Sequence, residues 1–75
     1  MMRPGQLYWH GTTPEACDIC KQALKAVFVD AKTRNGPWGM LCPGCHRVHG
    51  VGVGTGLGQR YVRQQSDGRW MKTIG

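Results

Sequence analysis

The sequence contains few carboxylates, few aromatic residues and no long hydrophobic run. Only four of its 75 residues are acidic, and they are scattered along the chain: Glu15, Asp18, Asp30 and Asp67. General acid–base chemistry needs paired groups and nucleophilic catalysis needs a base beside the nucleophile, so we expect no enzyme and no small-molecule substrate. No stretch approaches the roughly 20 apolar residues that cross a membrane. Residues 1–6 carry no signal-peptide pattern, and the sequence therefore predicts a cytoplasmic protein without a membrane partner.

The chain is also too short to bury a large apolar core. It has 75 residues and twelve glycines, which favours one loop-rich domain that needs a staple. Six aromatic residues are available for packing: Tyr8, Trp9, Phe28, Trp38, Tyr61 and Trp70.

All four cysteines stand in two Cys-x-x-Cys pairs, Cys17 with Cys20 and Cys42 with Cys45, separated by 21 residues. Each pair can present two thiolates from one tight turn, and two pairs supply the tetrahedral sulfur shell that zinc prefers. The separation is slightly longer than usual, which a variable intervening loop accommodates. The sequence predicts a structural zinc ion on these four residues, bound as the chain folds.

Other chemistries were weighed for the same cysteines. Disulfides require an oxidising compartment, and a two-residue gap rarely suits a bridge within a pair. A redox site needs only one pair and usually a longer α/β domain. The run from Cys42 to His46 matches the c-type haem attachment motif, but haem is attached after export and would leave Cys17 and Cys20 unexplained. His10 and His46 are spare candidate ligands, although four thiolates already complete the shell.

Positive charge is confined to one part of the sequence. The formal net charge is +6; residues 1–30 contribute zero and residues 31–75 carry all of it. This part is therefore the expected contact for an anionic partner, and a solvated surface is the alternative.

The order of local signals divides the single domain into four parts. These are an extended N-terminal segment (1–12), a zinc-binding core (13–50), a glycine-rich connector (51–58) and a C-terminal β-hairpin (59–75). Thr12, Pro14 and Glu15 would suit a helix start, but we favour a zinc knuckle at Cys17–Cys20, because metal binding overrides weak local propensity.

Two hairpins and one short helix follow the knuckle. Residues 26–30 read as a strand, Asn35-Gly36 as a hairpin turn, and residues 38–42 as the returning strand. Pro43 suits a first helical position, and Gly50 ends the helix. The alternating glycines of residues 50–58 favour a flexible or tightly turned connector, with an anion-binding loop as the alternative. Asp67-Gly68 turns the second hairpin.

The second hairpin interleaves aromatic and basic residues. If its aromatic rings share a face, the ribbon can contact phosphates and stack bases. The alternative is that Tyr61 and Trp70 pack on the zinc core while the cations extend into water. The candidate nucleic-acid residues are Arg60, Tyr61, Arg63, Arg69, Trp70 and Lys72.

The order of knuckle, hairpin and helix-borne second pair is similar to the treble-clef and zinc-ribbon class of fold. The run from Trp38 to Cys45 resembles the second half of GATA-type fingers, although no long basic recognition helix follows Gly50. A wider resemblance, from Cys17 to Tyr61, is to small zinc-finger proteins encoded by bacteriophages. It rests on the strand at 28–30, the Gly36-Pro37-Trp38 run, the second pair and the glycine run. This resemblance implies a small zinc-stabilised α+β fold and a viral origin.

The run from Leu41 to His49 also resembles the end of HNH nucleases. Those enzymes need an upstream histidine with metal-binding partners. His10 is the only upstream histidine and has no such neighbour, so we do not expect nuclease activity.

Two functions remain open. In the first, a zinc-binding module, with a regulatory role in a phage, binds nucleic acid through the basic residues of 31–75. In the second, the module docks on a host protein or a transcription complex through exposed strand edges. The charge asymmetry favours the first.

Overall fold

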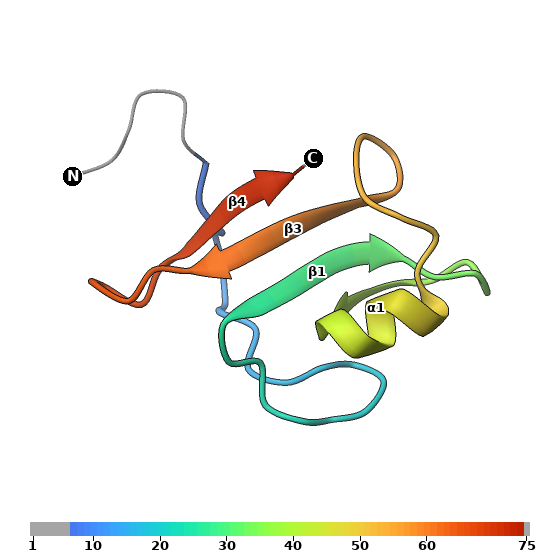
Figure 1. Cartoon of the computed structure of the whole chain (residues 1–75), viewed down its shortest axis with the longest axis horizontal. Coiled ribbons are helices and arrows are strands. Elements are labelled where there is room, and N and C mark those ends of the chain that lie inside the picture. Colours follow the sequence, from blue (N-terminus) through green and yellow to red (C-terminus); the bar gives the residue numbers. More distant parts are fainter. Residues whose placement is uncertain (1–6, 75) are drawn as a thin grey trace.

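Strand β1 (Val27–Lys32) lies at the centre of a four-stranded antiparallel sheet with the order β2-β1-β3-β4 (Figure 1). The computed structural model describes residues 7–74. Residues 1–6 of the predicted N-terminal segment and Gly75 of the predicted second hairpin lie outside the described residues. The other elements are β2 (Trp38–Leu41), α1 (Pro43–His49), β3 (Gly58–Arg63) and β4 (Trp70–Ile74). The predicted small α+β fold with one helix is present.

Both predicted hairpins form, but they join into one sheet through a pairing of β1 with β3. β1 runs to Lys32, beyond the predicted end at Asp30, because Lys32 still pairs with Trp38 of β2. The turn between them closes with hydrogen bonds from the Thr33 amide to the Pro37 carbonyl (3.0 Å) and from the Gly36 amide to the Thr33 carbonyl (2.9 Å). Gly36 has φ of +109°, which explains the glycine of the Asn-Gly turn.

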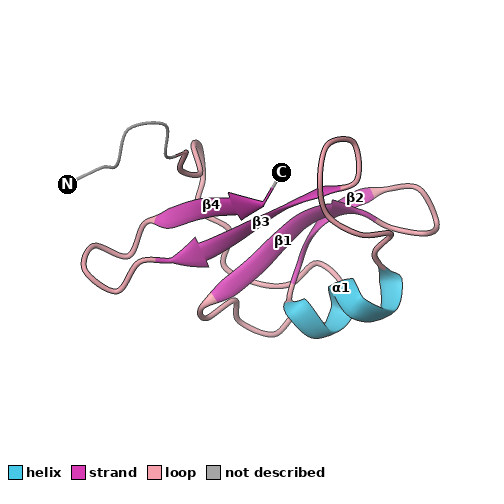
Figure 2. Ribbon diagram, turned by 45° about the horizontal axis from the view of Figure 1, so that its top comes forward, coloured by secondary structure: helices cyan, strands magenta, loops and turns pink. Residues whose placement is uncertain are grey.

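Alternate residues of β1 serve the two faces of the sheet. Phe28 faces an aromatic cluster, where it stacks on Tyr61 with ring centroids 4.9 Å apart and meets Trp70 edge-on at 4.8 Å. Trp9 packs edge-on against Phe28 at 5.6 Å. Val29 faces the other side, where α1 lies against the sheet (Figure 2). We call these two sides the aromatic face and the helix face.

The glycine-rich connector is a tight turn. From the sequence, either a flexible or a tightly turned connector is expected, and the structure has the second. Gly52, Gly54 and Gly56 have φ of +131°, +118° and +79°. The Gly54 amide donates to the Gly58 carbonyl at 2.8 Å, and the Lys32 amide donates to the Leu57 carbonyl at 3.0 Å, which fixes the loop onto β1. A side chain at Gly58 would place its Cβ 2.8 Å from that of Ala31, so the loop re-enters the sheet where only glycine fits.

Both outer strands of the sheet have hydrogen-bonded neighbours. Beside β4, the Lys72 amide donates to the Leu7 carbonyl at 2.8 Å and the Trp9 amide donates to the Trp70 carbonyl at 2.9 Å. Beside β2, the Asp18 amide donates to the Met40 carbonyl at 2.9 Å, and the Met40 amide donates to Asp18 Oδ2 at 2.8 Å. Among residues 7–74, no helix is long and apolar enough to cross a membrane.

Candidate metal centre

The first cysteine pair lies in a narrow knuckle rather than in a helix. Ala16 and Ala23 pair across its base, and the Cys17 amide donates to the Gln22 carbonyl at 2.9 Å. At the tip, the Ile19 amide donates to Cys17 Sγ at 3.4 Å. Lys21, with φ of +65°, turns the chain back towards β1. The knuckle that the sequence favoured over a helix is therefore present.

The second pair lies at the junction of β2 and α1. Cys42 is the N-cap residue of α1, and its Sγ accepts a hydrogen bond from the Cys45 amide at 3.4 Å. Pro43 occupies the start of the helix, as predicted, where its missing N–H costs nothing. The helix ends at His49, as predicted, but Gly50 is extended with φ of −79°. Its glycine is explained by space, because a Cβ at this position would collide with the His46 imidazole.

These two turns bring all four sulfur atoms together. The Sγ atoms of Cys17, Cys20, Cys42 and Cys45 all lie within 4.8 Å of one another. Across the two pairs, Cys20 Sγ and Cys42 Sγ are 3.8 Å apart. A tetrahedron with metal–sulfur bonds of about 2.3 Å has edges of about 3.8 Å. The arrangement can therefore hold one metal ion with little adjustment.

The same geometry bears on the alternatives. All four cysteines are free, and 3.8 Å is far longer than the roughly 2.05 Å of a disulfide bond. His46 lies outside the four-sulfur group of the described residues, and its Nε2 is 2.9 Å from the Gly52 carbonyl oxygen. His10 is exposed. The two spare histidines of the sequence thus lie apart from the sulfur cluster, and both cysteine pairs serve one centre.

The thiols of Cys17 and Cys45 have pKa values shifted in opposite directions. Burial raises the pKa of Cys17, but hydrogen bonds from the backbone of Cys42, Cys20 and Ile19 outweigh it and lower the pKa to about 6. Burial first, and then the neighbouring thiols of Cys42, Cys17 and Cys20, raise the pKa of Cys45 to about 12. A divalent cation removes this conflict, so metal binding would displace protons from the cluster.

The structure separates the residues that were expected to contact nucleic acid. Tyr61 and Trp70 are only 6% and 3% exposed, so the interpretation in which their rings stack on bases is corrected. Strand alternation directs both rings to the aromatic face. There they pack against Phe28 and are covered from solvent. The alternative, in which these rings pack inside the domain, agrees with the structure.

The basic residues of the second hairpin do not share one surface either. Arg63 lies over the Trp70 ring, with its guanidinium carbon 5.7 Å from the ring centroid. Arg69 lies over the Tyr8 ring at 3.9 Å. Arg60 instead lines a groove on the helix face. Lys72 lies on β4, where its amide pairs with the N-terminal segment.

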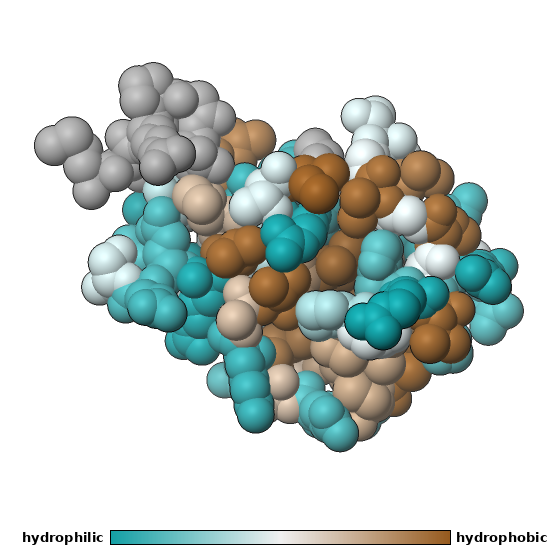
Figure 3. Space-filling model, in the orientation of Figure 1, coloured by the Kyte–Doolittle hydropathy of each residue, from teal (hydrophilic) through white to brown (hydrophobic). Residues whose placement is uncertain are grey.

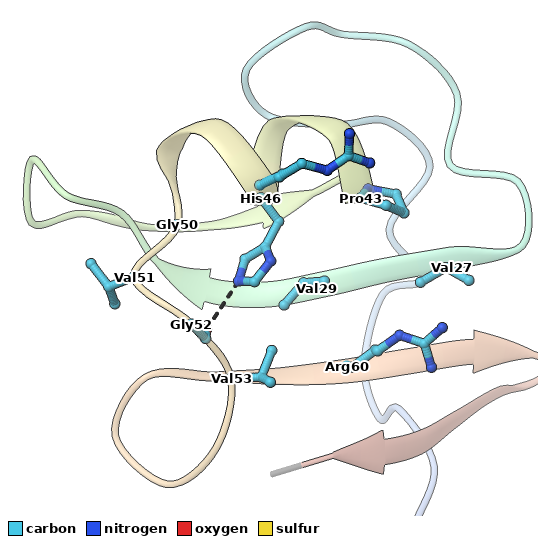
Figure 4. Close-up of a pocket in the computed structure, with 10 residues that line it drawn as sticks. Val27, Val29, Pro43, His46, Gly50, Val51, Gly52, Val53 and Arg60 are labelled. Atoms are coloured by element: carbon cyan, nitrogen blue, oxygen red, sulfur yellow. Dashed lines mark hydrogen bonds between the residues drawn. The ribbon is translucent and has the colours of Figure 1, made fainter.

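That groove, of about 610 Å³, lies between α1, β1, β3 and the start of the glycine-rich connector (Figure 4). Val27 and Val29 line it from the sheet, and His46 crosses it to reach the Gly52 carbonyl. In Figure 3, which shows this side of the molecule, apolar residues gather in the middle and hydrophilic residues flank them. Arg47 and Arg60 also line the groove, and none of its lining residues is a carboxylate.

No family model, no curated protein and no solved structure matches this chain.

Two functional features were missed from the sequence. Asp18, between the two cysteines of the first pair, ties the knuckle to β2 through Met40; an acidic residue inside a knuckle was the available signal. From the sequence, Trp38 counts among the aromatic residues available for packing, but it is 51% exposed, unlike the buried Tyr61 and Trp70. Its position directly after the Asn35-Gly36-Pro37 turn was the available signal, because turn residues lie at the surface.

Proposed function

We propose that the four cysteines hold a structural zinc ion in a treble-clef arrangement. Supporting this, one pair comes from a knuckle, the other from the start of α1, and the β1–β2 hairpin lies between them. Four thiolates fill a tetrahedral shell and leave no coordination position for a substrate, so the metal stabilises the fold and takes no part in catalysis. Free thiols in this pattern fit a reducing compartment such as the cytosol.

The zinc-stapled domain is a nucleic-acid-binding module, and the observation that carries this proposal is the groove on the helix face. Arg47 of α1 and Arg60 of β3 line it without a carboxylate to oppose them. Arginine binds phosphate through its planar, bidentate guanidinium, and the valines between the two arginines offer an apolar floor for a sugar. The proposed contact therefore lies within the basic residues of 31–75. It involves α1 and strand β3 and does not extend over the whole second hairpin.

A matched pair of double variants tests this assignment. Arg47→Glu with Arg60→Glu reverses the groove, whereas Lys25→Glu with Arg63→Glu makes the same charge change at a separate concave surface lined by those two residues. Fluorescence anisotropy of labelled oligonucleotides with the zinc-loaded protein is measured over a salt titration. Loss of two phosphate contacts lowers the slope of log K against log salt by about 1.4 to 1.8, and we expect this only for the groove variant.

The control variant also shows what would overturn the assignment. A larger loss with Lys25→Glu and Arg63→Glu would place the contact at the turn end of the β3–β4 hairpin. Equal salt slopes for all three proteins would show that neither surface contacts phosphate, and an equal reduction in both variants would mean that net charge alone attracts the oligonucleotide. No binding by the wild-type protein at low salt would reject the nucleic-acid function.

Docking on a host protein or a transcription complex is the second candidate. Strand addition was its physical basis, and the hydrogen bonds of Met40, Trp70 and Lys72 to neighbouring segments weaken that basis. We therefore place nucleic-acid binding first, with a regulatory role in a phage as the biological setting that the sequence resemblance suggests.

A further inference from the structure

Trp38 is the aromatic residue that the domain leaves outside its core. Its side chain is 51% exposed, and it is the one aromatic among the exposed large hydrophobic residues of positions 7–74. The other five aromatic residues pack within the sheet or its N-terminal neighbour: Tyr8, Trp9, Phe28, Tyr61 and Trp70. The exposed half of this indole, at the start of a strand, is available for a ligand.

The exposed ring borders a cleft of about 360 Å³ at the β2 edge, separate from the groove on the helix face. Three segments form it: the knuckle tip with Ile19, the turn at residues 33–37, and the end of α1 with His49. Ile19 is 40% exposed and adds a second apolar surface near the indole. The segments are held together, since the Arg34 amide donates to the His49 carbonyl at 2.8 Å and the Asp18 amide donates to the Met40 carbonyl at 2.9 Å. The cleft is thus a built concavity.

Cations lie beside the ring. Lys32 is the direct partner of Trp38 in the β1–β2 register, so the two side chains emerge on the same face of the sheet. Arg34 lines the cleft itself. The one carboxylate that lines it, Asp18, already accepts the Met40 amide through Oδ2. The ring is therefore flanked by positive charge, and an anionic chain with planar groups complements it.

We propose that this cleft takes an unstacked base from a single-stranded nucleic acid, which stacks on Trp38 while Lys32 and Arg34 contact the flanking phosphates. This rests on the proposed nucleic-acid function and specifies the form of its ligand. The bases of a duplex are stacked on one another and cannot reach a ring in a cleft, whereas a single strand can turn one out. Every base has a π-face, so the site selects for strandedness and tolerates different sequences.

The test compares single-stranded and duplex oligonucleotides binding to the zinc-loaded full chain and its Trp38→Ala variant. A stacked base contributes enough for its loss to weaken single-strand binding by about tenfold. Duplex binding is expected to change less than about twofold, because phosphate contacts at Arg47 and Arg60 remain. Val48→Ala removes a 61% exposed apolar side chain from α1 and serves as the matched control, with no expected change for either ligand.

Intrinsic fluorescence gives a second readout that does not depend on affinity. A base stacked on Trp38 quenches its emission, while Trp9 and Trp70 are packed against other rings and respond little. Trp38→Phe keeps an aromatic surface, so we expect it to restore most of the single-strand affinity that Trp38→Ala loses, and to abolish the quenching.

The outcomes separate this proposal from the function beneath it. Unchanged single-strand affinity in Trp38→Ala, together with loss of binding in the Arg47→Glu and Arg60→Glu variant, overturns the base site and leaves nucleic-acid binding intact. An equal loss for both ligands also overturns it, since a stacking site discriminates between them. No binding of either ligand by the wild type rejects both proposals at once.

Discussion

The two ends of the sheet differ in the side chains that gather there. Four cysteine sulfur atoms cluster at one end, and aromatic rings pack together at the other. The metal end comprises the knuckle at Cys17–Cys20, β2 and α1, which meet at four cysteines. The aromatic end comprises residues 7–9, β3 and β4, whose rings gather on Phe28. The helix α1 has no fully buried side chain, whereas Tyr61 and Trp70 of β3 and β4 are almost completely enclosed. A chain of 75 residues has few large apolar side chains with which to pack both ends, and a metal ion on the four cysteines would replace them at one.

Both ends depend on the same strand. β1 pairs with β2 towards the metal end and with β3 towards the aromatic end. Phe28 and Val29 are adjacent on it and are both buried, one on each face of the sheet. The two ends are stabilised by different interactions, but we expect them to unfold together because they share β1.

Removing the metal should give the largest effect. Chelation, or Cys42→Ser, takes away a stabilisation that reaches about 10–16 kcal/mol for structural zinc in small fingers. That is comparable to or larger than the whole stability of a small domain, so we expect the cooperative melting transition to disappear. Circular dichroism during heating, with and without chelator, measures it.

The exposed loop substitution Thr55→Ser is the control for this experiment, and it should melt as the wild type does. An aromatic end that keeps dispersed amide resonances after chelation would show that the two ends fold separately. An unchanged melting curve would contradict the structural role of the metal.

Truncation at the aromatic end should give the next largest effect. Phe28 is completely buried and contacts three rings, so Phe28→Ala is expected to cost about 3–5 kcal/mol in the free energy of unfolding. Urea denaturation of the zinc-loaded protein measures the loss, and Val48→Ala on the exposed side of α1 should stay within about 0.5 kcal/mol. Cobalt(II) substituted for zinc should still give a tetrahedral thiolate spectrum. Loss of that spectrum would mean that the metal end cannot form without the aromatic one.

The smallest effect is expected from Asp30, which lies on β1 between the two ends. Burial, and then the charge of Asp18, raise the pKa of the Asp30 carboxyl above its ordinary value. The folded chain therefore holds this proton more tightly than the unfolded chain. The ionised carboxylate opposes folding at any pH above the raised value, and the opposition fades as the pH falls towards the ordinary one.

Asp30→Asn should accordingly stabilise the protein at neutral pH. We expect no more than about 0.5 kcal/mol, because partial exposure screens the charge. Urea midpoints at neutral pH measure it, with Asp67→Asn in the exposed β3–β4 turn as the neutral control. A decrease in stability would show that the Asp30 carboxylate accepts a stabilising hydrogen bond.

The features of this fold that depend on local sequence could be predicted. The pairing between distant segments could not. The cysteine spacing, the Asn35-Gly36 and Asp67-Gly68 turns and Pro43 each act over a few residues, and the structure has the expected feature at each place. The pairing of β1 with β3 joins residues about thirty positions apart and leaves no short signal. Periodicity showed that Tyr61 and Trp70 could share a face, but not which face the core would cover.

Cys42 connects the metal cluster to the helix that lines the groove. Its sulfur accepts a hydrogen bond from the Cys45 amide in the first turn of α1 and belongs to the four-sulfur cluster. The same helix supplies Arg47 to the groove. For the proposed zinc ion and oligonucleotide, the shared helix would link the two affinities thermodynamically, and such linkage is reciprocal. If zinc raises the affinity for an oligonucleotide by some factor, the bound oligonucleotide raises the affinity for zinc by the same factor. Competition with a chelator, in the presence and absence of the oligonucleotide, would measure both sides of that cycle.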